Sequence, residues 1–121
     1  MSDVALVTGA TGLLGSYLVE RLLEDGWGVR ALVRHPEQAR WLEEAGAKLF
    51  AGDITDRPSI TSAASGCSLV FHAAASVGVG NDWETFRLGN VEGTENVLHA
   101  SAASGARFVF VSTTGVFGRA R

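Results

Sequence analysis

Three glycines directly after a short apolar run place the tightest constraint on how this chain can fold. The run Val4–Val7 predicts a buried strand, and Gly9, Gly12 and Gly15 then open an amphipathic segment. Glycine permits a sharp turn and a close backbone approach, and a helix N-terminus offers free N–H groups and a positive dipole end to an anion. The arrangement therefore predicts a dinucleotide phosphate site, the alternative being a turn with a purely structural role.

Strand and helix patterns alternate along the rest of the chain. Leu14, Leu18 and Leu22 repeat at helical spacing up to Gly26, and Pro36 favours a short helix. That second helix is expected to turn Trp41, Leu42 and Ala45 inward and to end at Gly46. Further helices are expected at 58–64 and 83–103. The other predicted strands are Val29–Val33, Lys48–Ala51, Leu69–Ala73 and Phe108–Val111.

Strands that are apolar on both faces and alternate with helices predict an α/β fold. The expected architecture is a Rossmann-type doubly wound parallel sheet with strand order 3-2-1-4-5. Ligands of such sheets bind beyond the carboxyl ends of the strands. The residues that follow the five predicted strands are Gly9, Arg34, Gly52-Asp53, Ala73-Ala74-Ala75 and Ser112-Thr113-Thr114.

Composition excludes several classes of partner. The net charge of −3 and pI of about 5.5 argue against nucleic acid and anionic membranes. No apolar run approaches the roughly 20 residues of a membrane span, and no His or Cys spacing predicts a metal site. The single cysteine, Cys67, cannot form an intrachain disulfide. We therefore expect a cytoplasmic protein.

Five motifs in order carry a resemblance to a known family. They are TGATGLLG (Thr8–Gly15), GDITD (Gly52–Asp56), HAAA (His72–Ala75), NVEGTENVL (Asn90–Leu98) and VSTTGVFG (Val111–Gly118). The chain resembles the N-terminal part of an extended short-chain dehydrogenase/reductase of the NAD-dependent epimerase/dehydratase group, with dihydroflavonol-4-reductase-like features. The resemblance covers almost the whole chain.

The resemblance implies which residues bind the cofactor. Asp53 would accept a hydrogen bond from the adenine amino group with Ile54 against the ring, the less favoured alternative being an Asx turn or a helix cap. Ala73, Ala74 and Ala75 would let the backbone approach the cofactor, or would serve close helix–strand packing. The residues expected at the pyrophosphate are Gly9, Thr11, Gly12, Leu13, Leu14 and Gly15.

The residue at the end of the second strand helps to predict whether the cofactor is NAD or NADP. An acidic residue there would bind the ribose 2′-OH of NAD, but this chain has Val33-Arg34. The guanidinium fork of Arg34 suits a 2′-phosphate, so NADP is the preferred cofactor and NAD the alternative. The alternative is that Arg34 is a solvated loop residue without a role in binding. Arg30 is expected to be an exposed strand residue.

Two residues are expected to take part in catalysis. A hydroxyl at Thr113 can hydrogen-bond a substrate carbonyl or alcohol, with Ser112 or Thr114 as alternatives and a plain polar cap as the structural reading. Asn90, by resemblance, would organise a water and proton relay, unless it is merely exposed on its helix. His72 is expected to be packed or bonded to backbone, and to have no catalytic role.

The chain departs from the family at the acid/base pair. The family uses Tyr-x-x-x-Lys, but the only tyrosine and lysine here are Tyr17 and Lys48. We therefore expect residues 1–121 to be a partial nucleotide-binding domain, inactive alone and truncated after the fifth strand. That strand would then be an apolar edge, prone to self-association.

The predicted function is the dinucleotide-binding part of an NAD(P)-dependent oxidoreductase or epimerase/dehydratase. It would act by hydride transfer on a small-molecule carbonyl or alcohol, such as a sugar nucleotide or a dihydroflavonol-like ketone. The alternative is a non-catalytic NAD(P)-binding sensor or scaffold module.

Overall fold

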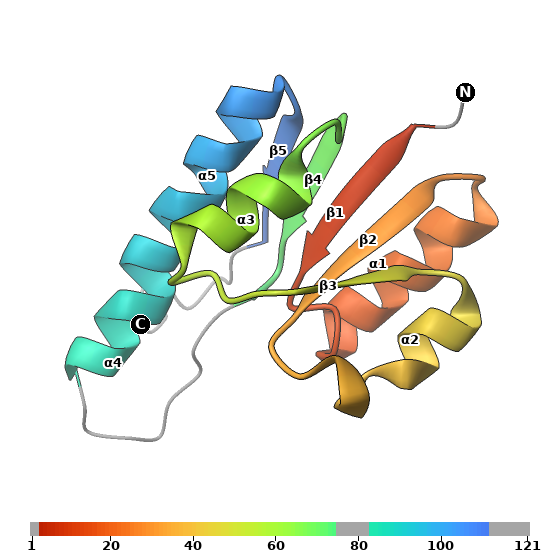
Figure 1. Ribbon diagram of the computed structural model, residues 1–121, viewed down its shortest axis with the longest axis horizontal. Helices are drawn as coiled ribbons and strands as arrows, with labels where there is room; N and C mark the ends of the chain where they lie inside the picture. Colours follow the sequence, from red (N-terminus) through yellow and green to blue (C-terminus); the bar gives the residue numbers. More distant parts are fainter. Residues whose placement is uncertain (1–2, 75–82, 112–121) are drawn as a thin grey trace, which may run out of the picture.

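The computed structural model describes residues 3–74 and 83–111, except for the Phe86 side chain, and these form a five-stranded parallel sheet between two layers of helices (Figure 1). The strand order is β3-β2-β1-β4-β5, which confirms the predicted doubly wound topology. The strands are β1 (Val4–Thr8), β2 (Gly28–Val33), β3 (Lys48–Ala51), β4 (Leu69–His72) and β5 (Arg107–Phe110).

The helices divide between the two faces of the sheet, α1 and α2 on one side and the others on the opposite side (Figure 1). A short 3₁₀ turn, η1 (Pro36–Gln38), precedes α2, and a π-helical segment, η2 (Leu88–Glu92), joins α4 to α5 without a break. The α-helices are α1 (Leu13–Glu24), α2 (Arg40–Ala45), α3 (Arg57–Ala64), α4 (Trp83–Arg87) and α5 (Gly93–Ser104).

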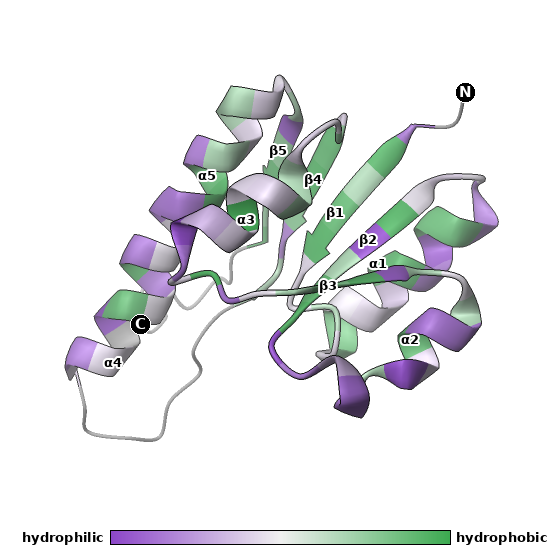
Figure 2. Cartoon of the chain, in the orientation of Figure 1, coloured by the Kyte–Doolittle hydropathy of each residue, from purple (hydrophilic) through white to green (hydrophobic). Residues whose placement is uncertain are grey.

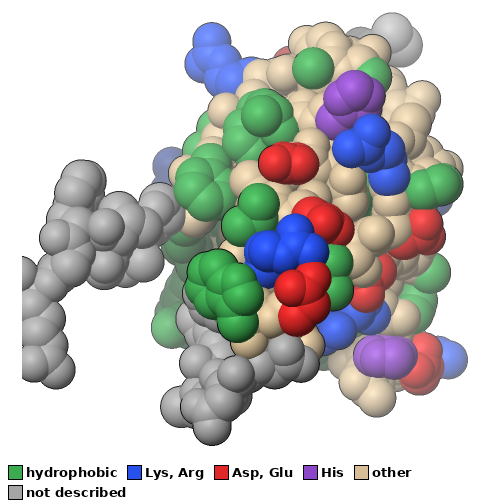
Figure 3. All heavy atoms as spheres, turned by 90° about the vertical axis from the view of Figure 1, so that its left-hand side faces the viewer, with side chains coloured by type: hydrophobic (Ala, Val, Ile, Leu, Met, Phe, Trp, Pro, Cys, Tyr) green, Lys and Arg blue, Asp and Glu red, His purple; other side chains and the backbone are tan. Residues whose placement is uncertain are grey.

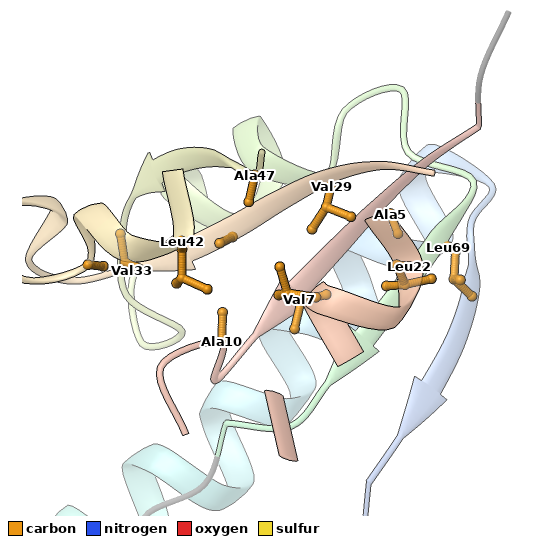
Figure 4. Packing of buried hydrophobic residues seen from close by; sticks show 12 residues of the cluster. Ala5, Val7, Ala10, Leu22, Val29, Val33, Leu42, Ala47 and Leu69 are labelled. Carbon is orange, nitrogen blue, oxygen red and sulfur yellow. The ribbon is translucent and has the colours of Figure 1, made fainter. Parts of the chain in front are cut away.

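Alternate residues of each strand face opposite layers, so the sheet has a core on each face. Val7 on β1 faces α1 and α2, where it packs in one cluster with Leu22 and Leu42 (Figure 4). Its neighbour Leu6 faces the other way and packs with Ile60 of α3 and Val97 of α5. The apolar character of the strands is visible along β1, β4 and β5 (Figure 2). Burial on both faces explains why these strands read as continuous apolar runs.

The expected burial of two helices was only partly right. In α1 the buried residues are Gly15, Val19 and Leu22, whereas Leu14 is exposed. Leu22 of the repeat is buried, but at the start of α1 the buried position is one residue after Leu14, because Gly15 must face the turn at Gly9.

In α2 only Leu42 is buried, and the side chains of Trp41 and Ala45 are exposed. The 3₁₀ turn of η1 sets the phase of α2. Its end places Ala39 and then Leu42 against the core, three residues apart.

The outer face of α4, η2 and α5 mixes apolar and charged side chains (Figure 3). Arg87 pairs with Glu84 and with Glu92, the latter at 2.9 Å. The exposed large apolar residues on these elements are Trp83, Leu88, Val91 and Leu98. Across the described ranges, no helix combines the length and apolarity needed to cross a membrane.

Candidate functional site

A cleft of about 750 Å³ opens at the carboxyl ends of the strands, where the predicted site was expected. Turns that follow β1, β2, β3 and β4 form its floor and sides, and α4 and η2 contribute a wall. Of the predicted site residues, those that line it are Gly9, Thr11, Gly12, Arg34, Asp53, Ile54, Ala73 and Ala74.

The first turn is built on two glycines that the protein itself requires. Gly9 has φ of 71°, and a Cβ there would lie 2.6 Å from the backbone nitrogen of Ala74. A Cβ on Gly15 would lie 1.9 Å from the carbonyl oxygen of Gly9. Any side chain at either position would therefore collide with backbone, so both glycines are needed for the close fit of β1, α1 and β4.

Gly12 differs from the other two glycines. It is exposed and is the N-cap of α1, with φ −79° and ψ 172°, a conformation that any residue adopts. A Cβ there would meet only the Gly9 carbonyl oxygen, at 3.4 Å. The described packing thus gives no reason for glycine at this position, which faces the cleft at the positive end of the α1 dipole.

The turn after β2 provides the positive charge of the cleft. Arg34 is exposed and forms no side-chain hydrogen bond or ion pair within the described ranges, while it lines the cleft beside His35 and Gln38. Arg30 was expected to be exposed, and this prediction was wrong. It is half-buried, donates hydrogen bonds to the carbonyls of Ala63 and Ser65, and lies over the Phe50 ring.

The turn after β3 is closed by its own side chains. Oδ1 of Asp53 accepts hydrogen bonds from the backbone N–H and the hydroxyl of Thr55, both at 2.9 Å, which is the Asx turn of the structural alternative. Oδ2 of Asp53 takes no part in these two bonds. Asp53 and Ile54 both line the cleft. The local role of Asp53 and a ligand-binding role are therefore compatible.

The turn after β4 lies tightly against the first one. Ala73 and Ala74 are small enough for the backbone there to approach Gly9, as the packing alternative requires, and both also line the cleft. Ala75 lies outside the described residues.

His72 is completely buried between β1 and α5. Its Nδ1 lies 2.6 Å from the Thr8 hydroxyl and its Nε2 lies 3.0 Å from the Thr94 hydroxyl. Burial lowers the pKa of His72 to about 4. A neutral ring donates from one nitrogen and accepts at the other, and two hydroxyls satisfy either tautomer. His72 is thus packed, as expected, but its partners are side chains.

The Thr8 hydroxyl also accepts a hydrogen bond from the backbone N–H of Ala74, at 3.2 Å. The network of Thr8, His72 and Thr94 therefore fixes the floor of the cleft to β4 and α5. Thr8 is fully buried, and its hydroxyl bonds to His72 and to the Ala74 N–H within the protein.

Several predicted site residues are not in the cleft wall. Leu13 and Leu14 are exposed on α1, and Gly15 lies buried beneath the turn. Asn90 is half-buried within η2 and is not among the lining residues. Thr113, with its alternatives Ser112 and Thr114, lies outside the described residues.

Sequence reasoning missed Asn96 on α5. Its side chain is 9% exposed, donates to the carbonyl of Ile54 at 2.9 Å and accepts from Nε of Arg57 at 3.0 Å. The signal that singled out Asn90, an asparagine inside a long helix, applies equally to Asn96. Gly93 permits close packing next to Asn96, because a Cβ there would lie 2.6 Å from Cδ1 of Ile54.

Comparison with protein families gives a match over nearly the whole chain. Residues 5–121 match the NAD dependent epimerase/dehydratase family. Cinnamoyl-CoA reductase 1 of Oryza sativa subsp. japonica is 42% identical over 93% of this chain and 35% of its own length. A putative dihydroflavonol 4-reductase of a Synechocystis strain is 36% identical over 98% of this chain and 35% of its own length. The chain thus spans about a third of these curated relatives.

Solved structures of similar proteins share the fold. Pen from Bacillus thuringiensis superposes with a TM-score of 0.89 at 26% identity, covering 97% of this chain and 39% of its own. A short-chain dehydrogenase/reductase superfamily protein from Agrobacterium tumefaciens, with bound NAD, gives a TM-score of 0.83 at 31% identity. That match covers 96% of this chain and 34% of the other.

Proposed function

Because the chain belongs to the NAD dependent epimerase/dehydratase family, we propose that it is the dinucleotide-binding part of an NAD(P)-dependent oxidoreductase or epimerase/dehydratase. The protein would transfer hydride to or from a carbonyl or alcohol carbon of a small-molecule substrate. The reductase names of the curated relatives and the NAD in the Agrobacterium tumefaciens structure support this assignment.

The observation that carries the proposal is the open space above Gly12. The other two glycines of the turn are explained by contacts within the protein, but Gly12 is not. A pyrophosphate seated on the N-terminus of α1 would explain it, because the ligand would need the volume that a side chain would fill. The donors are also suitable, since the first backbone N–H groups of a helix have no intrahelical acceptors. The residues present therefore fit the dinucleotide.

The proposed binding residues divide among the adenine, the nicotinamide end and the pyrophosphate of the cofactor. Asp53 and Ile54 would bind adenine. Ala73 to Ala75 would form the surface beneath the nicotinamide end, which supplies or accepts the hydride when the cofactor is bound. The residues proposed at the pyrophosphate are Gly9, Thr11, Gly12, Leu13, Leu14 and Gly15. Leu13 and Leu14 would act by covering it from the exposed start of α1.

Two residues of this chain are proposed to act on the substrate. The Thr113 hydroxyl would hydrogen-bond the reacting oxygen, because a hydroxyl both donates and accepts. Asn90 would hold a water in the path of the proton. The acid/base group that exchanges a proton with the substrate oxygen would be a tyrosine of a Tyr-x-x-x-Lys pair, which these 121 residues do not contain.

Calorimetric titration of the chain with NADP⁺ tests the assignment. Gly12→Ala should weaken binding by about tenfold or more, because its Cβ occupies the space for the pyrophosphate while leaving the fold intact. Gly28→Ala is the matched control. Gly28 lies at the opposite end of β2, where a Cβ would make an ordinary 3.4 Å contact with Val4. Absence of NADP⁺ and NAD⁺ binding to the unmodified chain would overturn the proposal.

The same titration decides between the two cofactors. We propose a preference for NADP, which rests on the exposed guanidinium of Arg34, unpaired among the residues that the structure describes, and on Arg34 in place of an acid directly after β2. Arg34→Gln should reduce NADP⁺ affinity about tenfold or more and leave NAD⁺ affinity nearly unchanged. Arg40→Gln, an exposed arginine that does not line the cleft, should change neither. Equal or tighter binding of NAD⁺ by the unmodified chain would contradict the preference.

We also propose that the chain self-associates through β5. Within the described residues this strand pairs only with β4, and Phe110 at its end is 52% exposed. An apolar strand with one unpaired edge is a template for a further strand.

A further inference from the structure

The turn after β3, residues 52–56, is held in place by α5 as well as by its own bonds. Internally, Asp53 Oδ1 accepts from Thr55 and the Asp53 carbonyl accepts from the backbone N–H of Asp56 at 2.9 Å. Such bonds determine the shape of a turn. Its position in the cleft depends on contacts with other elements. The Ser59 hydroxyl of α3 accepts from the Asp53 N–H at 3.2 Å, and α5 lies beside α3 (Figure 1).

Two residues of α5 hold Ile54 at the centre of the turn. The side-chain amide of Asn96 donates to the Ile54 carbonyl at 2.9 Å, and Gly93 leaves the space into which the Ile54 side chain packs. Gly93 and Asn96 are three residues apart, so they lie on one helix face. Backbone and side chain of Ile54 are thus both fixed to the same turn of α5.

Arg57 determines how the Asn96 amide is oriented. Its Nε lies 3.0 Å from Oδ1 of Asn96. Because a guanidinium only donates, the side of the amide that faces Arg57 must be the oxygen, which leaves the NH₂ group facing the Ile54 carbonyl. The chain Arg57–Asn96–Ile54 therefore permits one amide orientation. Asn96 is buried, so a rotated amide would lose both bonds without water to replace them.

We propose that Asn96 is a positioning residue for the adenosine end of the bound dinucleotide, acting through the turn that carries Asp53 and Ile54. This inference rests on the proposed function, because it assigns the ligand of that turn. Asn96 does not line the cleft and touches no ligand. It sets where the Asp53 carboxylate and the Ile54 side chain lie relative to the other turns of the cleft.

The test combines ADP-ribose binding with hydrogen–deuterium exchange on the 121-residue chain. Asn96→Asp keeps an acceptor for Arg57 and the same size, but it replaces the donor to Ile54 with a second oxygen. We expect about tenfold weaker ADP-ribose binding by calorimetry and faster amide exchange confined to residues 53–56. Ser101→Ala is the control, since Ser101 is buried on the same helix and its hydroxyl donates to the Val97 carbonyl of that helix.

A second variant keeps the test decisive should the buried carboxylate prevent folding. Arg57→Ala removes an exposed side chain and frees the Asn96 amide to rotate, so it should produce the same changes to a smaller degree. Wild-type affinity in both variants, or weaker binding without faster exchange at 53–56, would overturn the proposal. So would exchange that rises along all of α5, as general destabilisation would cause. Failure of the unmodified chain to bind ADP-ribose would instead overturn the proposed function, and the exchange data would still report on the turn.

Discussion

At the residue scale, His72 couples the stability of the protein to pH. Its folded-state pKa is lowered to about 4 by burial, against an ordinary value of 6.5. Between these values the unfolded chain binds a proton at this site that the folded chain does not. The stability contributed by neutral His72 is therefore complete above about pH 6.5 and is lost as the pH falls towards 4.

We predict that protonation of His72 lowers the free energy of unfolding by at most roughly 3 kcal/mol between pH 7 and pH 4. Urea denaturation at pH 7, 6 and 5 measures the slope. His72→Asn should flatten it, because the amide does not titrate, at the expense of a lower stability at pH 7. His99→Gln removes an exposed histidine on α5 and should keep the wild-type slope. Equal slopes in the wild type and His72→Asn would show that His72 is not the group responsible.

At the element scale, the placement of α1 depends on one contact between helix and turn. The Gly15 position lies so close to the Gly9 carbonyl that α1 would have to move away to admit a methyl group. The helix carries Val19 and Leu22 into the core, so any such movement also opens that packing.

Gly15→Ala should therefore lower the free energy of unfolding by about 3 kcal/mol, despite the better helix propensity of alanine. Gly12→Ala, three residues earlier, should change it by less than about 1 kcal/mol, because its Cβ fits. Urea titration of both variants measures the difference. Similar stabilities for the two would mean that the turn relaxes at little cost.

The same contact shows how far the sequence could predict the elements. The strands were predicted to within one residue at each end, because burial on both faces leaves long apolar runs bounded by glycine and charge. The buried faces of α1 and α2 were predicted only at Leu22 and Leu42. Helix phase depended on the contact of Gly15 with Gly9 and on the 3₁₀ turn before α2, neither of which the apolar pattern shows.

The site followed the same pattern. Gly9, Arg34 and Asp53 could be placed at one cleft because the carboxyl ends of parallel strands share an edge. The hydrogen bonds behind the cleft could not be predicted. His72–Thr94 and Asn96–Ile54 join residues that are 22 and 42 positions apart in the sequence. The π-helical segment was also missed, because Leu88–Glu92 has no helix-breaking residue other than glycine.

At the scale of the whole molecule, the edge of β5 that no other described strand pairs with is expected to control association. The backbone N–H of Arg107 donates to the carbonyl of Ser68, just before β4, and that of Val111 donates to the carbonyl of His72 on β4. By the two-residue period of a strand, Phe108 and Phe110 direct theirs to the open edge. Proline at position 110 would thus block a further strand without breaking the β4 pairing.

Size-exclusion chromatography with light scattering should show concentration-dependent self-association of the unmodified chain. Phe110→Pro should shift it to the monomer, whereas Phe110→Val keeps the N–H and should still associate. A monomer at all concentrations for the unmodified chain would contradict the proposed association.

A single turn of α5 holds three of the contacts described above. Gly93 receives Ile54, Thr94 bonds His72, and Asn96 bonds the Ile54 carbonyl. This turn is therefore the common reference for both the β3 side and the β4 side of the cleft. A shift of α5 by one residue, about 1.5 Å along its axis, would break all three contacts together. The two sides of the cleft cannot move independently while both are bonded to α5. Any opening of the cleft would therefore require α5 to move as well.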